Sequence, residues 1–403
     1  MSSAFNRVLI GMSILALWLA AAPAFGQFGG GGFGGAEGPQ VSREQLEDYA
    51  DILGLDADQR EIAQMMLEEY IDGVQTATDT LREAGQKARQ EYEETRDASA
   101  FRALRELSEQ TRERTATLET QLMADLQTML TPDQGEAWPR VEMAHRRATT
   151  LPRGLMSGER VDLFEIVKGL ELEGEPANEA RALLTDYEMA LDRVLIARNE
   201  KFEQGVEMFR QRDFESLQSH FEGAREASIR VRDTNRTFAR RLEAVVPEEK
   251  LPVLESAVRR ASFPSVYRQN RADRALEAAK GLEDLSADQR ERIEAIGLTT
   301  ERRMAQVNRK LADTIESNEL SMTLRDMMRG GRRGNEDGTR ELFGEKRDVV
   351  NQTVEQIRAV LTEDQAAKIE SAIGSDEERE ARGDRARQGG RGDRAQRARQ
   401  REF

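Results

Sequence analysis

The 403-residue sequence contains no cysteine, only two histidines and only 5% aromatic residues. Without cysteine, disulfide bonds, thiol catalysis and cysteine-based zinc sites are excluded. Neither His145 nor His220 has a second histidine at the spacing of a metal-binding pair. The sequence also lacks a nucleophile elbow, a phosphate-binding loop and an EF-hand loop. We therefore expect no enzyme activity, no cofactor and no metal site.

The chain is acidic and strongly polar. Its formal net charge of −15 disfavours nucleic-acid binding, because an acidic surface repels phosphate groups. Charged residues make up 33% of the chain and the mean hydropathy is −0.69. Such a composition is typical of long helices that bury a narrow apolar stripe, with methionines filling the gaps that few aromatics can fill.

The N-terminus resembles an export signal. Arg7 precedes an apolar run, Val8 to Ala21, that is too short for a comfortable membrane span. Small residues follow, with cleavage expected after Ala24 or Gly26. These features predict a secretory signal peptide over 1–26, and an uncleaved anchor helix is the alternative. We expect a periplasmic or extracellular protein without an integral membrane span.

Two low-complexity segments flank the body of the chain. Residues 27–40 are rich in glycine and are expected to form a flexible spacer. Residues 375–403 consist almost entirely of Arg, Gly, Asp, Glu, Gln and Ala and should be disordered. This tail is interpreted as a solvated polyampholyte, and a basic arm that contacts anionic lipid or polysaccharide is the alternative.

The body contains a repeat of roughly 115 residues. An opening motif begins at Leu55, at Leu285 and, in weaker form, at Leu172, and a closing motif begins 74 to 76 residues later at Leu130, Leu361 and Val246. An Arg-Asp pair recurs between them at residues 96–97, 212–213 and 325–326. No proline lies at 40–131, at 177–246 or after 264, so long helices are permitted. We predict an all-α fold with tandem helical units over 41–150, 151–267 and 268–374.

The motifs themselves read as helix starts. A Thr, Ser or Asp can cap the helix while a Gln three residues later reaches back to the cap, and the preceding Leu can enter the core. The candidate site residues, all in this helix-capping role, are Leu55, Asp56, Gln59, Leu130, Thr131, Gln134, Leu285, Ser286, Gln289, Leu361, Thr362 and Gln365. The central unit lacks both the polar cap and the Gln, so its helix starts should be weaker unless Pro176 and Pro247 substitute for them.

These motifs resemble those of the LTxxQ family of periplasmic proteins, the Spy/CpxP-like envelope-stress chaperones. The best matches are the segments beginning at Leu130 and Leu361, whereas the openers carry Asp or Ser in place of Thr. The resemblance implies long bent helical hairpins and either ATP-independent binding of unfolded proteins or a role in sensing envelope or metal stress. Family members usually have one unit, and some use a basic concave surface, whereas this chain strings three units together and is acidic.

The sequence thus favours an exported helical binding protein whose partners are unfolded or envelope proteins. The alternative is a coiled-coil scaffold or spacer of the cell envelope, and either protein could form a homo-oligomer. Adjacent acids such as Glu68 and Glu69 are typical of a solvated helix face rather than a catalytic pair. We expect Trp138 to pack at a joint between units, His145 to be structural or exposed, and His220 to be packed.

Overall fold

The structure is a computed structural model that describes residues 39–97, 99–211, 213–324 and 336–373. Every regular element in these ranges is helical and none is a strand, which confirms the predicted all-α fold. The predicted signal peptide, nearly all of the predicted spacer and the predicted tail lie outside the described residues. Gln40, at the end of that spacer, donates its backbone N–H to the Tyr70 hydroxyl at 2.8 Å and is thereby anchored.

The described chain divides into two compact units. The first contains residues 39–262 and 321–324, and the second contains residues 263–320 and 336–373. The second unit thus begins a few residues before the predicted third repeat, and the first spans nearly all of the other two repeats. The division into three repeats stays a prediction.

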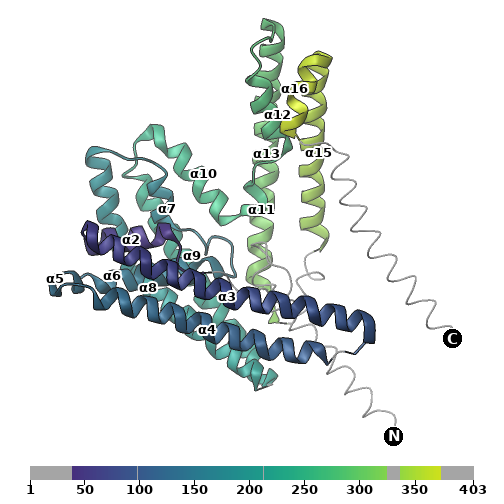
Figure 1. Ribbon diagram of the computed structural model, residues 1–403. Coiled ribbons are helices and arrows are strands. Elements are labelled where there is room, and N and C mark those ends of the chain that lie inside the picture. The colour runs from purple at the N-terminus through teal and green to yellow at the C-terminus, as the bar shows by residue number, and fades with distance from the viewer. Residues whose placement is uncertain (1–38, 98, 212, 325–335, 374–403) are drawn as a thin grey trace, which may run out of the picture. The chain divides into compact units, whose positions relative to one another are not determined.

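The N-terminal part of the first compact unit is an antiparallel hairpin of α3 and α4, with shorter helices at its base (Figure 1). Gly54 ends the first helix with φ of 62°, a left-handed conformation that glycine adopts without steric cost. Buried residues of α3 recur every three or four positions, as one helix face requires, and pack against α4 and α6. The elements are α2 (Arg43–Leu53), α3 (Ala57–Thr95), α4 (Ala100–Thr128), α5 (Pro132–Gly135) and α6 (Trp138–Thr150).

A second antiparallel hairpin, α8 and α9, completes the first compact unit (Figure 1). Tyr187 and Leu195 of α8 are buried with Val231 and Leu242 of α9 in one apolar cluster. Arg147 of α6 donates to Glu188 of α8 at 3.3 Å, which ties the two hairpins together. The elements are η2 (Leu151–Arg153), α7 (Leu163–Lys168), α8 (Gly174–Arg210), α9 (Phe214–Glu243), η3 (Glu248–Lys250) and α10 (Leu251–Ser262).

The second compact unit is built on two long helices, α13 and α15, that run antiparallel. The hydroxyls of Thr300 and Thr353 lie 2.9 Å apart in the buried seam between them, and Arg303 donates to Gln352 at 2.8 Å. Alanines of α12 pack against α15 and α16. The elements are α11 (Pro264–Tyr267), α12 (Arg271–Lys280), α13 (Ala287–Ser321), α15 (Glu336–Val360) and α16 (Glu363–Ile373).

The described residues of the recurring Arg-Asp pair, Arg96, Asp97 and Asp213, lie where a hairpin turns. Arg96 follows α3 with φ of 59°, and the Asp97 carboxylate accepts hydrogen bonds from the N–H and hydroxyl of Ser99, which lower the pKa of Asp97. Asp213 caps α9 by accepting from the Ser216 N–H at 3.1 Å. The third pair lies outside the described residues. Residues 325–335 lie outside them too, and α15 begins at Glu336.

Candidate functional site

The first pair of motifs forms two reciprocal helix caps. The Asp56 carboxylate accepts from the Gln59 N–H at 2.9 Å, while the Gln59 side-chain oxygen accepts from the Asp56 N–H at 3.2 Å. Thr131 and Gln134 repeat this exchange at 3.4 and 3.0 Å, with Pro132 in the first helical turn. Each box satisfies backbone N–H groups that a helix start otherwise leaves open.

The second compact unit contains the same two devices. Ser286 and Gln289 exchange hydrogen bonds at 3.2 and 2.9 Å, and Thr362 and Gln365 do so at 3.3 and 3.1 Å. The leucines that precede the caps pack into the apolar clusters, as their position predicts. Leu55, Leu285 and Leu361 are buried and Leu130 is partly buried in the apolar clusters.

The structure brings each opening motif against its closing motif. Gln59 Nε2 donates to Gln134 Oε1 at 2.9 Å, and Gln134 Nε2 donates to Gln59 Oε1 at 2.8 Å. Each amide also donates across the junction to a backbone carbonyl, at 3.4 Å to Met129 and at 3.3 Å to Gly54. A glutamine amide has two donor hydrogens and one oxygen with two lone pairs, so both amides are fully used.

The junction recurs in the second compact unit. Gln289 Nε2 donates to Gln365 Oε1 at 2.8 Å and to the Val360 carbonyl at 3.0 Å, and Gln365 Nε2 donates to the Asp284 carbonyl at 2.9 Å. In both junctions the accepting carbonyl lies two residues before the opposite cap. We call these two sites the amide junctions. They lock the ends of a hairpin together through groups that neither titrate nor react.

A charged pair borders the second amide junction. Lys368 Nζ lies 2.7 Å from the carboxylate of Asp284. The backbone carbonyl of the same Asp284 accepts the hydrogen bond from Gln365. The hydrogen bond between Lys368 and Asp284 lowers the pKa of Asp284 and raises that of Lys368. Both groups are exposed, so the pair adds orientation to the junction more than stability.

The predicted central repeat has no glutamine pair, but a side chain of its closing motif still bonds to the segment that precedes its first long helix. Helix α8 begins without a side-chain cap, as the sequence predicts. Lys250, which follows Val246 as Gln134 follows Leu130, donates its ammonium to the Leu170 carbonyl at 2.6 Å. Sequence reasoning missed this role, although the position of Lys250 in the closing motif was a usable signal.

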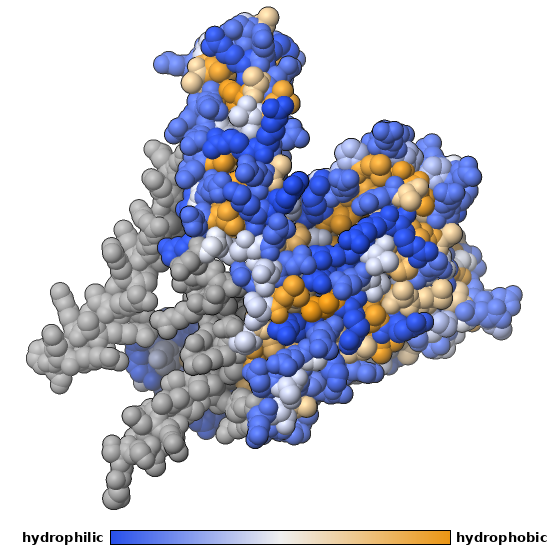
Figure 2. Space-filling view, turned by 180° about the vertical axis from the view of Figure 1, so that it is seen from behind, coloured by the Kyte–Doolittle hydropathy of each residue, from blue (hydrophilic) through white to orange (hydrophobic). Residues whose placement is uncertain are grey.

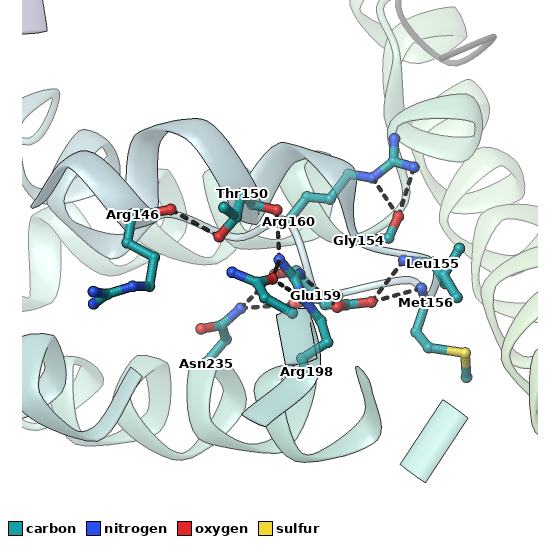
Figure 3. Close-up of polar contacts among 11 residues, drawn as sticks. Arg146, Thr150, Gly154, Leu155, Met156, Glu159, Arg160, Arg198 and Asn235 are labelled. Atoms are coloured by element: carbon teal, nitrogen blue, oxygen red, sulfur yellow. Dashed lines mark hydrogen bonds and ion pairs between the residues drawn. The ribbon is translucent and has the colours of Figure 1, made fainter. Parts of the chain in front are cut away.

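The most deeply buried polar site was not predicted from the sequence (Figure 3). One Glu159 oxygen accepts from Arg198 at 2.7 Å, and the other accepts from the backbone N–H groups of Leu155 and Met156 at 2.7 and 3.0 Å. Arg198 also donates to the Thr150 carbonyl at 2.6 Å. Asn235 of α9 donates to the Glu159 carbonyl at 2.9 Å. This network clamps the turn between η2 and α7 onto the second hairpin.

The aromatic and histidine residues considered from the sequence are all held by neighbours. Trp138 is buried and donates to Glu142 at 3.0 Å. His145 lies between Tyr49, whose hydroxyl is 3.1 Å from Nδ1, and Glu119, 2.9 Å from Nε2. Burial raises the pKa of Tyr49. His220 of α9 contacts the Lys201 carbonyl of α8 and covers Gly205, where a Cβ would meet its ring at 3.2 Å.

The polar contacts described above therefore hold helix starts and turns of the described residues in place. Within these residues, no cluster of three or more His, Cys, Asp or Glu side chains is arranged to hold a metal ion. Both oxygens of the one carboxylate in the buried network, Glu159, are already hydrogen-bonded. Comparison of the chain with protein-family models, with curated proteins and with solved structures finds no match.

Proposed function

We propose that this protein is an exported binding protein that holds apolar segments of unfolded or envelope proteins on its helical hairpins, without a nucleotide. It performs no chemistry on its clients. Their capture depends on exposed apolar side chains. The amide junctions and the Lys250 bridge keep the hairpins that carry these side chains in shape.

One observation carries this proposal. Nine large apolar side chains of the described residues are exposed, and eight of them lie on the first helix of a hairpin, α3, α8 or α13. These three helices make up only about a third of the described residues. The eight residues are Ile62, Met65, Tyr92, Met189, Ile196, Val206, Leu298 and Leu320. The return helices α4, α9 and α15 contribute none of the nine among their described side chains.

The setting of these side chains suits reversible capture. On the face that Figure 2 shows, apolar surface forms separate patches among hydrophilic residues. A charged surround keeps a protein soluble while it exposes apolar surface, and small patches bind weakly enough to release a client. Methionine adapts its shape to many partners, which favours binding of varied sequences. The resemblance to LTxxQ proteins and the predicted signal peptide point the same way.

The test is suppression of aggregation when a chemically denatured protein is diluted into buffer without ATP. We expect the full-length chain to reduce light scattering at a few-fold molar excess. A triple variant, Met65→Ser, Met189→Ser and Leu298→Ser, removes one exposed apolar side chain from each first helix and should lose most of this effect. The matched control changes exposed residues of the return helices, Gln127→Ser, Glu226→Ser and Glu355→Ser.

Absence of suppression by the wild-type chain at several-fold excess would overturn the proposal. Equal suppression by the triple variant would reject the first helices as the binding surface. The envelope scaffold makes a different prediction, a stable homo-oligomer with no affinity for unfolded chains. Size-exclusion chromatography with light scattering on the same samples separates the two functions.

A further inference from the structure

Among these exposed apolar residues, Met65 stands in unusual surroundings. Met65 of α3 is 57% exposed, and Ile62, one turn earlier, is 41% exposed. The buried residues Ala63, Leu67 and Val74 lie on the opposite side of the helix, so Met65 points directly into solvent. Ile62 lies at the edge of the same surface. Apolar contact area is therefore available here without any rearrangement of the core.

Carboxylates surround this apolar pair. Residues 41–79 contain eleven Asp and Glu but only two Arg. The spacing 58, 61, 65, 69 and 72 follows one helix face, so Met65 lies within a column of acids. The carboxylates of Asp58, Glu61, Glu69 and Asp72 form no hydrogen bond or ion pair with other described residues. We call the surface formed by these four acids with Ile62 and Met65 the α3 acidic–apolar face.

The nearby cations do not neutralise this face. Arg60 donates to Glu47 at 2.9 Å and to Asp51 at 2.7 Å, so its charge is directed toward α2. Arg43 contacts Glu68 at 3.2 Å, at the side of the face. Lys168 lies 2.8 Å from Glu44 of α2. The negative charge on the outer side of α3 is left for a partner.

We propose that the α3 acidic–apolar face docks segments that are both basic and amphipathic. An amphipathic helix would place its apolar side chains on Ile62 and Met65 and its Lys or Arg side chains beside the four carboxylates. Apolar contact supplies most of the affinity, and the carboxylates select the charge of the client and speed its approach. This inference rests on the proposed function and adds to it the class of segment that one hairpin prefers.

Leu298 of α13 offers a matched contrast. It is also 57% exposed and also lies on the first helix of a hairpin. Its charged neighbours one turn away on the helix are Arg302, Glu294 and Glu301, so a cation lies beside it, as none does in the column of acids around Met65. A basic segment therefore gains apolar contact at Leu298 but weaker electrostatic attraction than at Met65. We expect the preference for basic clients to arise at α3.

The experiment measures the binding of two fluorescent peptides to the full-length chain by anisotropy. One is an 18-residue amphipathic helix of Leu and Lys, and the other replaces every Lys with Glu. We expect the Lys peptide to bind and the Glu peptide to bind at least about tenfold more weakly. Replacing both Ile62 and Met65 by Ser should weaken Lys-peptide binding about tenfold or more. Leu298→Ser should leave it unchanged.

A charge variant tests the second half of the proposal. Glu61→Gln with Glu69→Gln and Asp72→Asn should lower the affinity for the Lys peptide and flatten its dependence on salt concentration. Equal binding of the two peptides, or Lys-peptide binding that the Ile62 and Met65 changes do not alter, would overturn the proposal. Selective peptide binding without suppression of aggregation would retain the α3 face and reject the broader proposed function.

Discussion

Arg198 and Glu159 form an ion pair at 2.7 Å in which both side chains are completely shielded from solvent. Arg198 is the largest fully buried side chain of the described residues. Burying two charges is costly unless their donors and acceptors find partners, and here backbone groups and the Asn199 side chain supply further hydrogen bonds. The pair joins the middle of α8 to the turn that precedes α7.

Removing one member of this pair should be strongly destabilising. Arg198→Met leaves the Glu159 carboxylate buried without its counter-charge, so we expect a loss of about 3–5 kcal/mol in the free energy of unfolding. Urea denaturation followed by circular dichroism measures this. Arg193→Met, at an exposed position five residues earlier on α8, is the control and should change stability by less than about 0.5 kcal/mol. Similar losses for both variants would show that the buried pair is not a stabilising clamp.

The first amide junction should behave as a coupled pair. Gln59→Ala and Gln134→Ala should each cost about 1–2 kcal/mol, because each opens a helix cap and leaves the opposite amide without its partner. The double variant should cost less than the sum, with a coupling of at least about 0.5 kcal/mol in a double-mutant cycle. Gln127→Ala on the exposed side of α4 is the control. Strict additivity would mean that the two caps act independently and the amide contact contributes nothing.

Lys250 should replace the amide junction in the central repeat. Lys250→Met removes the donor to the Leu170 carbonyl, and we expect a loss of about 1–2 kcal/mol, measured by thermal unfolding. Lys250→Gln restores a donor of the kind found at Gln134 and should recover part of that loss. Glu249→Gln, at the exposed neighbouring position, should have little effect. A Lys250→Met variant as stable as the wild type contradicts the bridge.

Lys346 should produce a rise of stability with pH. Burial lowers its pKa in the folded chain, and the Asp273 charge offsets this only in part. The unfolded chain has the ordinary value of about 10.4, so between the lowered value and 10.4 the unfolded state binds more protons. The free energy of unfolding therefore increases as pH rises through that window.

The measurement compares wild type with Lys346→Met by urea denaturation from pH 7 to pH 10. The difference between the two proteins cancels the titration of other groups. We expect the wild type to gain stability relative to the variant as pH rises, since the ammonium that donates to the Val266 carbonyl loses its desolvation cost on deprotonation. A constant difference would show that Lys346 titrates alike in both states.

Helix starts were predictable from the sequence because capping is local. The residues of a capping box are three positions apart, so the pattern at Thr131 and Gln134, or at Ser286 and Gln289, defines its own hydrogen bonds. The apolar spacing along α3 and α13 likewise predicts long helices, because one helix face repeats every three or four residues. The missing side-chain cap of α8 followed from the same local logic.

Other features of the sites depend on segments far apart in the chain. The glutamine of one cap meets the glutamine of another 75 residues away, and no local pattern states that they share a junction. Lys250 and Leu170 are 80 residues apart, and Asn235 lies 76 from Glu159. The bias of exposed apolar residues toward the first helices also emerged only when burial was known.

The sequence by itself determined that the described chain is helical, where many of its helices start and how far the long ones run, because propensity, capping and apolar period act over a few residues. Only the tertiary structure determined which of those helix starts contact one another. Packing of the hairpins places Gln59 against Gln134, buries Arg198 on Glu159 and leaves Met65 in solvent. These outcomes depend on which helix faces meet, and that is decided by contacts between segments distant along the chain.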